Sequence, residues 1–123
     1  MRRTSVLLVE DELMISEMVA DVLAENGFDV HTEVNGEAAL NYLDSGPEVD
    51  LLFTDINLQG RMDGATLAKA VRERRPDLPV VYCSGRHSSS AISPLVTRSV
   101  FVKKPYDLQD VCTLLSRMTG PPH

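Results

Sequence analysis

The sequence SVLLVEDE at residues 5–12 is a short apolar run closed by three acidic residues. Two later runs have a similar form, DLLFTD at residues 50–55 and VFVKKP at residues 100–105. Continuous apolar runs of this length, each followed by a helix-like stretch, are typical of parallel strands buried on both faces. Ligands of an open parallel sheet bind beyond the carboxyl ends of its strands. We therefore expect the acidic residues and a lysine to meet at one functional site.

The order of the predicted elements favours an α/β fold with a doubly wound, five-stranded parallel sheet. Strand-like segments lie at residues 5–10, 28–32, 49–54, 79–84 and 99–102. Helical patterns start after the acidic cluster and end at Asn26-Gly27, and recur at 36–43, 63–75 and 107–118. Right-handed crossovers then place helices on both faces of the sheet.

Three features of the helical segments can be checked directly. The first segment has apolar residues at helical spacing on a predicted core face: Ile15, Met18, Val19, Val22 and Leu23. Asp63 is a plausible N-cap of the third. Residues 85–97 contain the run Ser88-Ser89-Ser90 and Pro94, so a helix there is expected to be weak or partly disordered.

Length and composition favour a single domain over residues 1–123, with a flexible tail at 119–123. The net charge of −6 argues against a nucleic-acid surface, and no apolar stretch approaches a membrane span. Cys83 and Cys112 fit free thiols in a reducing cytosol better than a disulfide framework. We expect a cytoplasmic protein without direct DNA or membrane binding.

The residues at the strand ends suggest phosphoryl chemistry. Glu10, Asp11 and Asp55 would form a pocket of oxygen ligands suited to Mg²⁺, with Mn²⁺ as a possible substitute. Asp55, on the central strand, is the natural nucleophile for an acyl phosphate. Lys104 would pair with a phosphoryl oxygen, and the Ser84 hydroxyl would donate to another.

Together these residues resemble the receiver domain of bacterial two-component response regulators. The resemblance covers essentially the whole chain and rests on Val-Glu-Asp-Glu at 9–12, Asp55 with Asp63-Gly64 downstream, Ser84-Gly85 and Lys104-Pro105. It implies a CheY-like, flavodoxin-like (βα)5 fold with strand order 2-1-3-4-5.

The resemblance also implies roles for individual residues. It makes Asp55 the phosphoacceptor, Asp11 a direct magnesium ligand and Glu10 a ligand reached through water. The backbone carbonyl of Asn57 would complete the protein's share of the coordination. Lys104 becomes the phosphate-pairing lysine, with a cis peptide bond to Pro105. Ser84 takes the place of the switch Ser/Thr, and Phe101 that of the switch aromatic.

Some features depart from the common pattern of these domains. The residues that follow the phosphoacceptor include Leu58-Gln59 where a Leu-Pro or Met-Pro pair is usual, and Gly60-Arg61 lengthens the loop. Residues 79–85 resemble a receiver subgroup with a Phe-Ala-Thr-Gly-Tyr signature, in which the fourth helix is poorly formed. Phe101 lacks a hydroxyl, so the switch cannot use a tyrosine hydrogen bond.

The resemblance implies a stand-alone receiver, a signalling phosphoacceptor rather than an enzyme. A sensor histidine kinase or a histidine phosphotransfer protein would supply the phosphoryl group, and a downstream protein would read the change. Transfer to Asp55 would be self-catalysed and autodephosphorylation slow. The domain is expected to be a monomer or weak dimer.

The same residues argue against two other classes of protein. A flavodoxin-like cofactor binder needs a Ser/Thr/Gly-rich phosphate loop, whereas residues 10–12 would repel phosphate without a metal. A haloacid-dehalogenase-like phosphatase needs a second aspartate where this chain has Asn57. Two alternatives stay open: a receiver excised from a hybrid histidine kinase, and a receiver-like interaction module that is not phosphorylated. The presence of Asp11, Asp55 and Lys104 argues against the second.

Overall fold

The computed structural model describes residues 3–85 and 96–119, in which strands and helices alternate along the chain. The elements are β1 (Ser5–Val9), α1 (Leu13–Glu25), β2 (Asp29–Glu33), α2 (Gly36–Asp44), β3 (Leu51–Asp55), α3 (Gly64–Arg74), β4 (Val80–Ser84), β5 (Ser99–Lys103) and α4 (Leu108–Thr119). The weak helix predicted before β5 falls on residues 86–95, outside the described residues.

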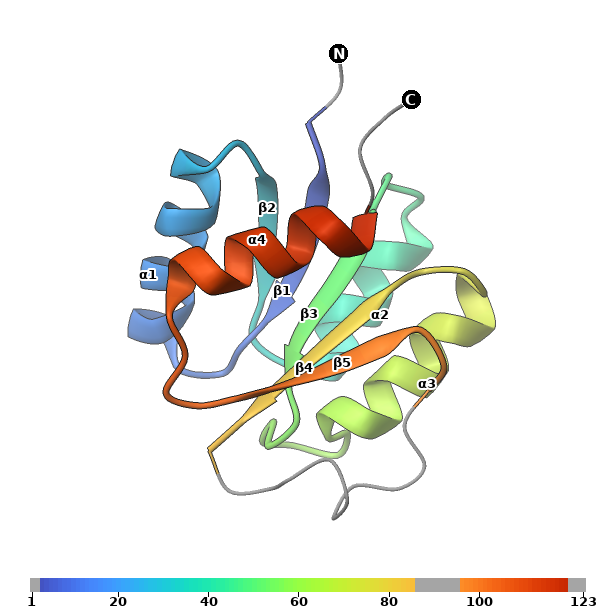
Figure 1. Ribbon diagram of the computed structural model, residues 1–123. Helices are drawn as coiled ribbons and strands as arrows, with labels where there is room; N and C mark the ends of the chain where they lie inside the picture. The colour runs from blue at the N-terminus through green and yellow to red at the C-terminus, as the bar shows by residue number, and fades with distance from the viewer. Residues whose placement is uncertain (1–2, 86–95, 120–123) are drawn as a thin grey trace.

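The five strands form one parallel sheet in the order β2-β1-β3-β4-β5. This confirms the predicted fold class and strand order. Figure 1 shows α1 and α4 on one face of the sheet and α2 and α3 on the other. Every residue of β3 and β4 is buried, as their continuous apolar sequences predict.

Alternate side chains of the strands supply two separate cores, one on each face. Strand residues that pack with α2 and α3 include Leu7, Val9, Leu52, Val80 and Tyr82. Strand residues that pack with α1 and α4 include Val6, Leu8, Leu51, Phe53 and Val81. None of the described helices is long and apolar enough to cross a membrane.

The helix boundaries follow local signals in the sequence. The Asp63 side chain accepts a hydrogen bond from the Thr66 amide (2.8 Å), so the predicted N-cap of α3 is confirmed. α1 ends before Asn26-Gly27 as expected, with Gly27 at φ +94°, a conformation that glycine adopts without steric cost. α4 extends through Thr119, one residue into the predicted tail; residues 120–123 are outside the described part of the chain.

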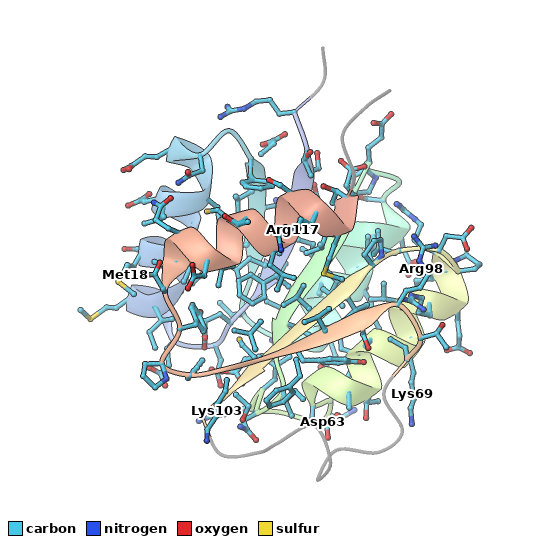
Figure 2. All side chains as sticks on the ribbon, in the orientation of Figure 1. Met18, Asp63, Lys69, Arg98, Lys103 and Arg117 are labelled. Carbon is cyan, nitrogen blue, oxygen red and sulfur yellow. The ribbon has the colours of Figure 1, made fainter. Side chains whose placement is uncertain are left out.

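The predicted core face of α1 was wrong at one position. Val19 and Leu23 are buried, but Met18 is 54% exposed, and Met14 on the same helix is 84% exposed. The apolar arc of α1 is therefore wider than the core it covers. The exposed Met18 lies beside the amino-terminal end of α4, and Figure 2 shows it at the molecular surface.

Gly64 brings the start of α3 into close contact with the end of β3. A Cβ atom on Gly64 would lie 2.2 Å from the carbonyl oxygen of Asp55 and 2.7 Å from the Cα atom of Ile56. The Gly64 amide donates to the Ile56 carbonyl (2.9 Å), which fixes this approach. Only glycine fits here without a backbone shift, so Gly64 holds the main chain of Asp55 in place.

We predict that Gly64→Ala lowers the free energy of unfolding by about 1–3 kcal/mol, because the new methyl group meets rigid backbone. Urea denaturation measures the change. The matched control is Gly85→Ala, whose Cβ would lie at an ordinary contact distance of 3.7 Å from Cβ of Lys104; it should change stability by less than about 0.5 kcal/mol. Equal stability of the two variants would contradict the close-approach argument.

Candidate functional site

The carboxyl ends of the strands bring Glu10, Asp55 and Lys104 together. The ammonium nitrogen of Lys104 lies 2.8 Å from Oδ2 of Asp55 and 3.4 Å from Oε1 of Glu10. The Lys104 amide donates to the Ser84 carbonyl (2.9 Å), which continues the pairing of β4 and β5 and fixes the lysine backbone. The predicted meeting of acidic residues and lysine at one edge of the sheet is confirmed.

Both carboxylates in this cluster are buried. The side chains of Glu10 and Asp55 are 5% and 9% exposed, and that of Lys104 is 26% exposed. Burial raises the pKa of Glu10 above its ordinary value, although the Glu12 amide and the charge of Lys104 oppose the rise. Burial also disfavours the Lys104 ammonium, but the hydrogen bond and charge of Asp55 outweigh it and raise the pKa of Lys104. Lys104 is therefore held as a cation.

Asp55 is held by contacts to both of its carboxylate oxygens. Oδ1 accepts a hydrogen bond from the Asn57 amide (2.8 Å), and Oδ2 accepts one from Lys104. The first contact comes from the loop that follows β3, and the second from the end of β5. These two contacts fix the orientation of the carboxylate at the strand end.

Asp11 extends the acidic cluster toward the loop after β3. Its Oδ2 accepts a hydrogen bond from the Gln59 amide (3.2 Å), so it ties the end of β1 to that loop. The carboxyl group of Asp11 also approaches that of Glu10 and contributes to the raised pKa of Glu10. Lys104 thus contacts two carboxylates, those of Asp55 and Glu10, and Asp11 lies on the Glu10 side of this pair.

The two predicted switch residues lie on β4 and β5. Ser84 is fully buried at the end of β4, and its Oγ accepts a hydrogen bond from the side-chain amide of Asn57 (2.8 Å). Phe101 is partly buried, pairs in register with Tyr82, and packs on the core beneath α2 and α3. Phe101 has no hydroxyl, but Tyr82 has one. The hydroxyl oxygen of Tyr82 accepts a hydrogen bond from the Val96 amide (3.4 Å).

Two further predictions for this region are confirmed. The Lys104–Pro105 peptide bond is cis, as predicted. Cys83 and Cys112 are both buried and free, as predicted.

The family model described as "Response regulator receiver domain" matches residues 6–116. The chain belongs to the response regulator receiver domain family. The same assignment follows from the acidic residues, lysine and serine at the strand ends described above.

Curated relatives of this receiver domain are longer proteins. It is 30% identical over 115 residues to the nitrogen assimilation regulatory protein NtrX of Azorhizobium caulinodans, covering 91% of this chain and 25% of that protein. It is 31% identical over 118 residues to the sensor kinase CckA of Brucella abortus, covering 93% of this chain and 12% of that protein. The chain therefore spans a quarter or less of these relatives.

A solved structure matches the receiver domain along nearly its whole length. A response regulator receiver protein from Sinorhizobium medicae has a TM-score of 0.89 and 30% identity, with 96% of this chain and 95% of that chain covered. The receiver domain of the hybrid histidine kinase CckA has a TM-score of 0.81 and 28% identity, with 94% and 99% covered.

The donor groups of the receiver domain fit a hard divalent cation. The side chains of Glu10, Asp11 and Asp55 supply three carboxylate groups, whereas Lys104 supplies one ammonium group. Carboxylates are ligands that Mg²⁺ prefers. Within residues 3–85 and 96–119, no group of three or more His, Cys, Asp or Glu side chains is close enough to enclose a metal ion.

The sequence interpretation missed two features near the site. One is the contact from the Asn57 side chain to Ser84, since only the backbone carbonyl of Asn57 was expected to matter. The other is an apolar groove of about 390 Å³ lined by Ile15, Met18, Lys104, Pro105, Tyr106 and Leu108. The signal for the groove was the wide apolar arc of α1, which was assigned to the core.

We predict that Lys104→Met lowers the free energy of unfolding in chelator by about 1–3 kcal/mol, because Asp55 and Glu10 lose their shared cation. The same variant should bind Mg²⁺ more tightly than wild type, because the site becomes more negative. Thermal unfolding and calorimetric titration measure the two effects. The control Lys103→Met removes an exposed charge and should change neither. Weaker Mg²⁺ binding by Lys104→Met would contradict this electrostatic account.

Proposed function

We propose that this receiver domain accepts a phosphoryl group on Asp55 from a histidine kinase or a histidine phosphotransfer protein. Phosphorylation then changes its contacts with a downstream protein. The observation that carries the proposal is the contact of 2.8 Å between Lys104 and the buried Asp55, with further carboxylates beside it. A carboxylate so placed has a cation ready for the phosphoryl oxygens, which is what phosphoryl transfer requires.

The proposed reaction is a direct transfer. A carboxylate oxygen of Asp55 forms a bond to phosphorus while the bond from phosphorus to the donor nitrogen breaks. The electron pair of that bond stays on the nitrogen of the donor histidine, and the imidazole ring becomes neutral again. The Lys104 ammonium pairs with an arriving phosphoryl oxygen, and the Asn57 amide holds the carboxylate during attack. The aspartate is consumed in the reaction, so the domain is an acceptor and not an enzyme; slow hydrolysis of the acyl phosphate resets it.

Asp11, Asp55 and the backbone carbonyl of Asn57 are the proposed ligands of Mg²⁺, with Glu10 reached through water. The chemistry that Mg²⁺ supplies when bound is neutralisation of charge on the phosphoryl oxygens. The contacts of Glu10 and Asp55 with one shared cation, Lys104, support this assignment, because two buried carboxylates carry more negative charge than one ammonium group balances. Mn²⁺ has a similar preference for oxygen ligands and is expected to substitute.

Incubation with acetyl phosphate and Mg²⁺ is expected to add one phosphoryl group to the wild-type domain, as read by intact mass. Asp55→Asn keeps the shape of the side chain but loses the nucleophilic oxygen, so the mass gain should disappear; a chelator should also abolish it. Asp11→Asn should weaken Mg²⁺ binding by removing a charged ligand. Phosphorylation of Asp55→Asn at another residue would refute the assignment of Asp55.

The apolar groove is the proposed docking surface of the phosphodonor protein. Lys104 lines the groove with its stem and contacts Asp55 with its ammonium, so the groove leads directly to the acceptor. The strongly exposed Met14 and Leu13 extend this surface along the first turn of α1. A donor that brings a phosphohistidine to Asp55 must lie against these side chains, and burying them would favour the complex.

Met18→Lys is expected to lower the kcat/KM of phosphotransfer from a histidine kinase by about tenfold, a loss typical of a central apolar contact. The rate with acetyl phosphate should not fall in parallel, because this small donor does not need the groove. Val34→Lys is the matched control, since Val34 is exposed and apolar but does not line the groove. An equal loss with both donors would mean that Met18→Lys perturbs the site and not docking.

A further inference from the structure

Asn57 contacts both residues that would have to respond to phosphorylation. Its main-chain amide donates to Oδ1 of Asp55 (2.8 Å), and its side-chain nitrogen donates to Oγ of Ser84 (2.8 Å). Asp55 and Ser84 close the adjacent strands β3 and β4, which pair through Asp55 and Cys83. One loop residue therefore links the proposed acceptor to the proposed switch serine, using its main chain for one and its side chain for the other.

The bond to Asn57 is one of the contacts that position the Ser84 hydroxyl. Ser84 is fully buried, and a buried hydroxyl that loses a hydrogen-bond partner is costly unless another group replaces it. Asn57 itself is only partly buried, so its amide can turn to water when it is released. A phosphoryl oxygen on Asp55 is a strong acceptor that would attract the Ser84 hydroxyl toward Asp55. Any movement of Oγ out of its 2.8 Å contact with Asn57 weakens that bond.

We propose that the side-chain amide of Asn57 is a latch that holds Ser84 in the unphosphorylated position and thereby opposes the activated state. This inference rests on the proposed function, since it assumes that Asp55 accepts the phosphoryl group and that Ser84 responds. The latch is a positioning device, because the Asn57 side chain acts on the acceptor only through Ser84. Its strength sets part of the equilibrium between the resting and activated conformations.

Asn57→Ala separates the latch from the other contacts of this residue. The variant keeps the main-chain amide that binds Asp55 and the backbone carbonyl proposed for Mg²⁺, and it removes only the donor to Ser84. Removing a bond that exists in the resting state should favour activation. We expect Asn57→Ala to bind beryllofluoride, a phosphoryl mimic, about three- to tenfold more tightly when each protein is saturated with Mg²⁺.

A double-mutant cycle with Ser84→Ala assigns the effect. In a Ser84→Ala background the latch has no acceptor, so Asn57→Ala should no longer change beryllofluoride affinity. Calorimetric titration of wild type, both single variants and the double variant gives the four affinities, and thermal unfolding establishes that each variant is folded. Weaker or unchanged binding by Asn57→Ala, or the same gain without Ser84, would overturn the latch.

The wild-type domain provides a second readout. The side-chain amide resonances of Asn57 in ¹⁵N-correlated spectra should shift when Mg²⁺ and beryllofluoride are added, and Ser84→Ala should show the shifted position before addition. Unmoved resonances would overturn the latch as well. Failure of the wild type to bind beryllofluoride and to gain mass from acetyl phosphate would instead overturn the proposed function. The two ideas therefore fail by different results.

Discussion

The ammonium group of Lys104 compensates two carboxylates that the sheet buries, and the arrangement of the strand ends depends on it. Asp55 lies on β3 and Lys104 follows β5, with β4 between them. Neighbouring strands are about 4.8 Å apart, so a cation from β5 must cross the end of β4 to reach Asp55. The long side chain of lysine spans this gap, and the bond from its amide to Ser84 fixes the starting point. Burying Asp55 and Glu10 without it would leave charges uncompensated.

The loop after β3 holds Asp55 and Asp11 through its backbone more than through its side chains. The amides of Asn57 and Gln59 donate to Asp55 and Asp11, and Gly64 returns the chain against the main chain of Asp55. The loop can thus differ in sequence from other receivers and keep its geometry. The substitution of Leu58-Gln59 for the usual proline-containing pair is compatible with this, since Gln59 contributes its N–H, which proline lacks.

The family resemblance predicted the sheet order. The sequence pattern itself predicted most boundaries and the meeting of Glu10, Asp55 and Lys104, because strand ends of a parallel sheet converge whatever the details of packing. Two kinds of feature were not predictable. The surface position of Met18 depends on how far the core of one face extends, which periodicity alone does not define. The bond from Asn57 to Ser84 depends on a side-chain rotamer, and residues 27 positions apart give no sequence signal of such a contact.

Lys104 lines the apolar groove, and its ammonium group contacts Asp55, so one residue belongs to two surfaces. A molecule bound in the groove and a group bound to Asp55 then influence the same lysine. Such linkage is reciprocal: if occupation of the groove alters the affinity of the site for a phosphoryl group, phosphorylation alters the affinity of the groove by the same factor. A partner that delivers the phosphoryl group through this groove would then be bound with different strength after the transfer, and the product of the reaction would itself regulate how long the complex lasts.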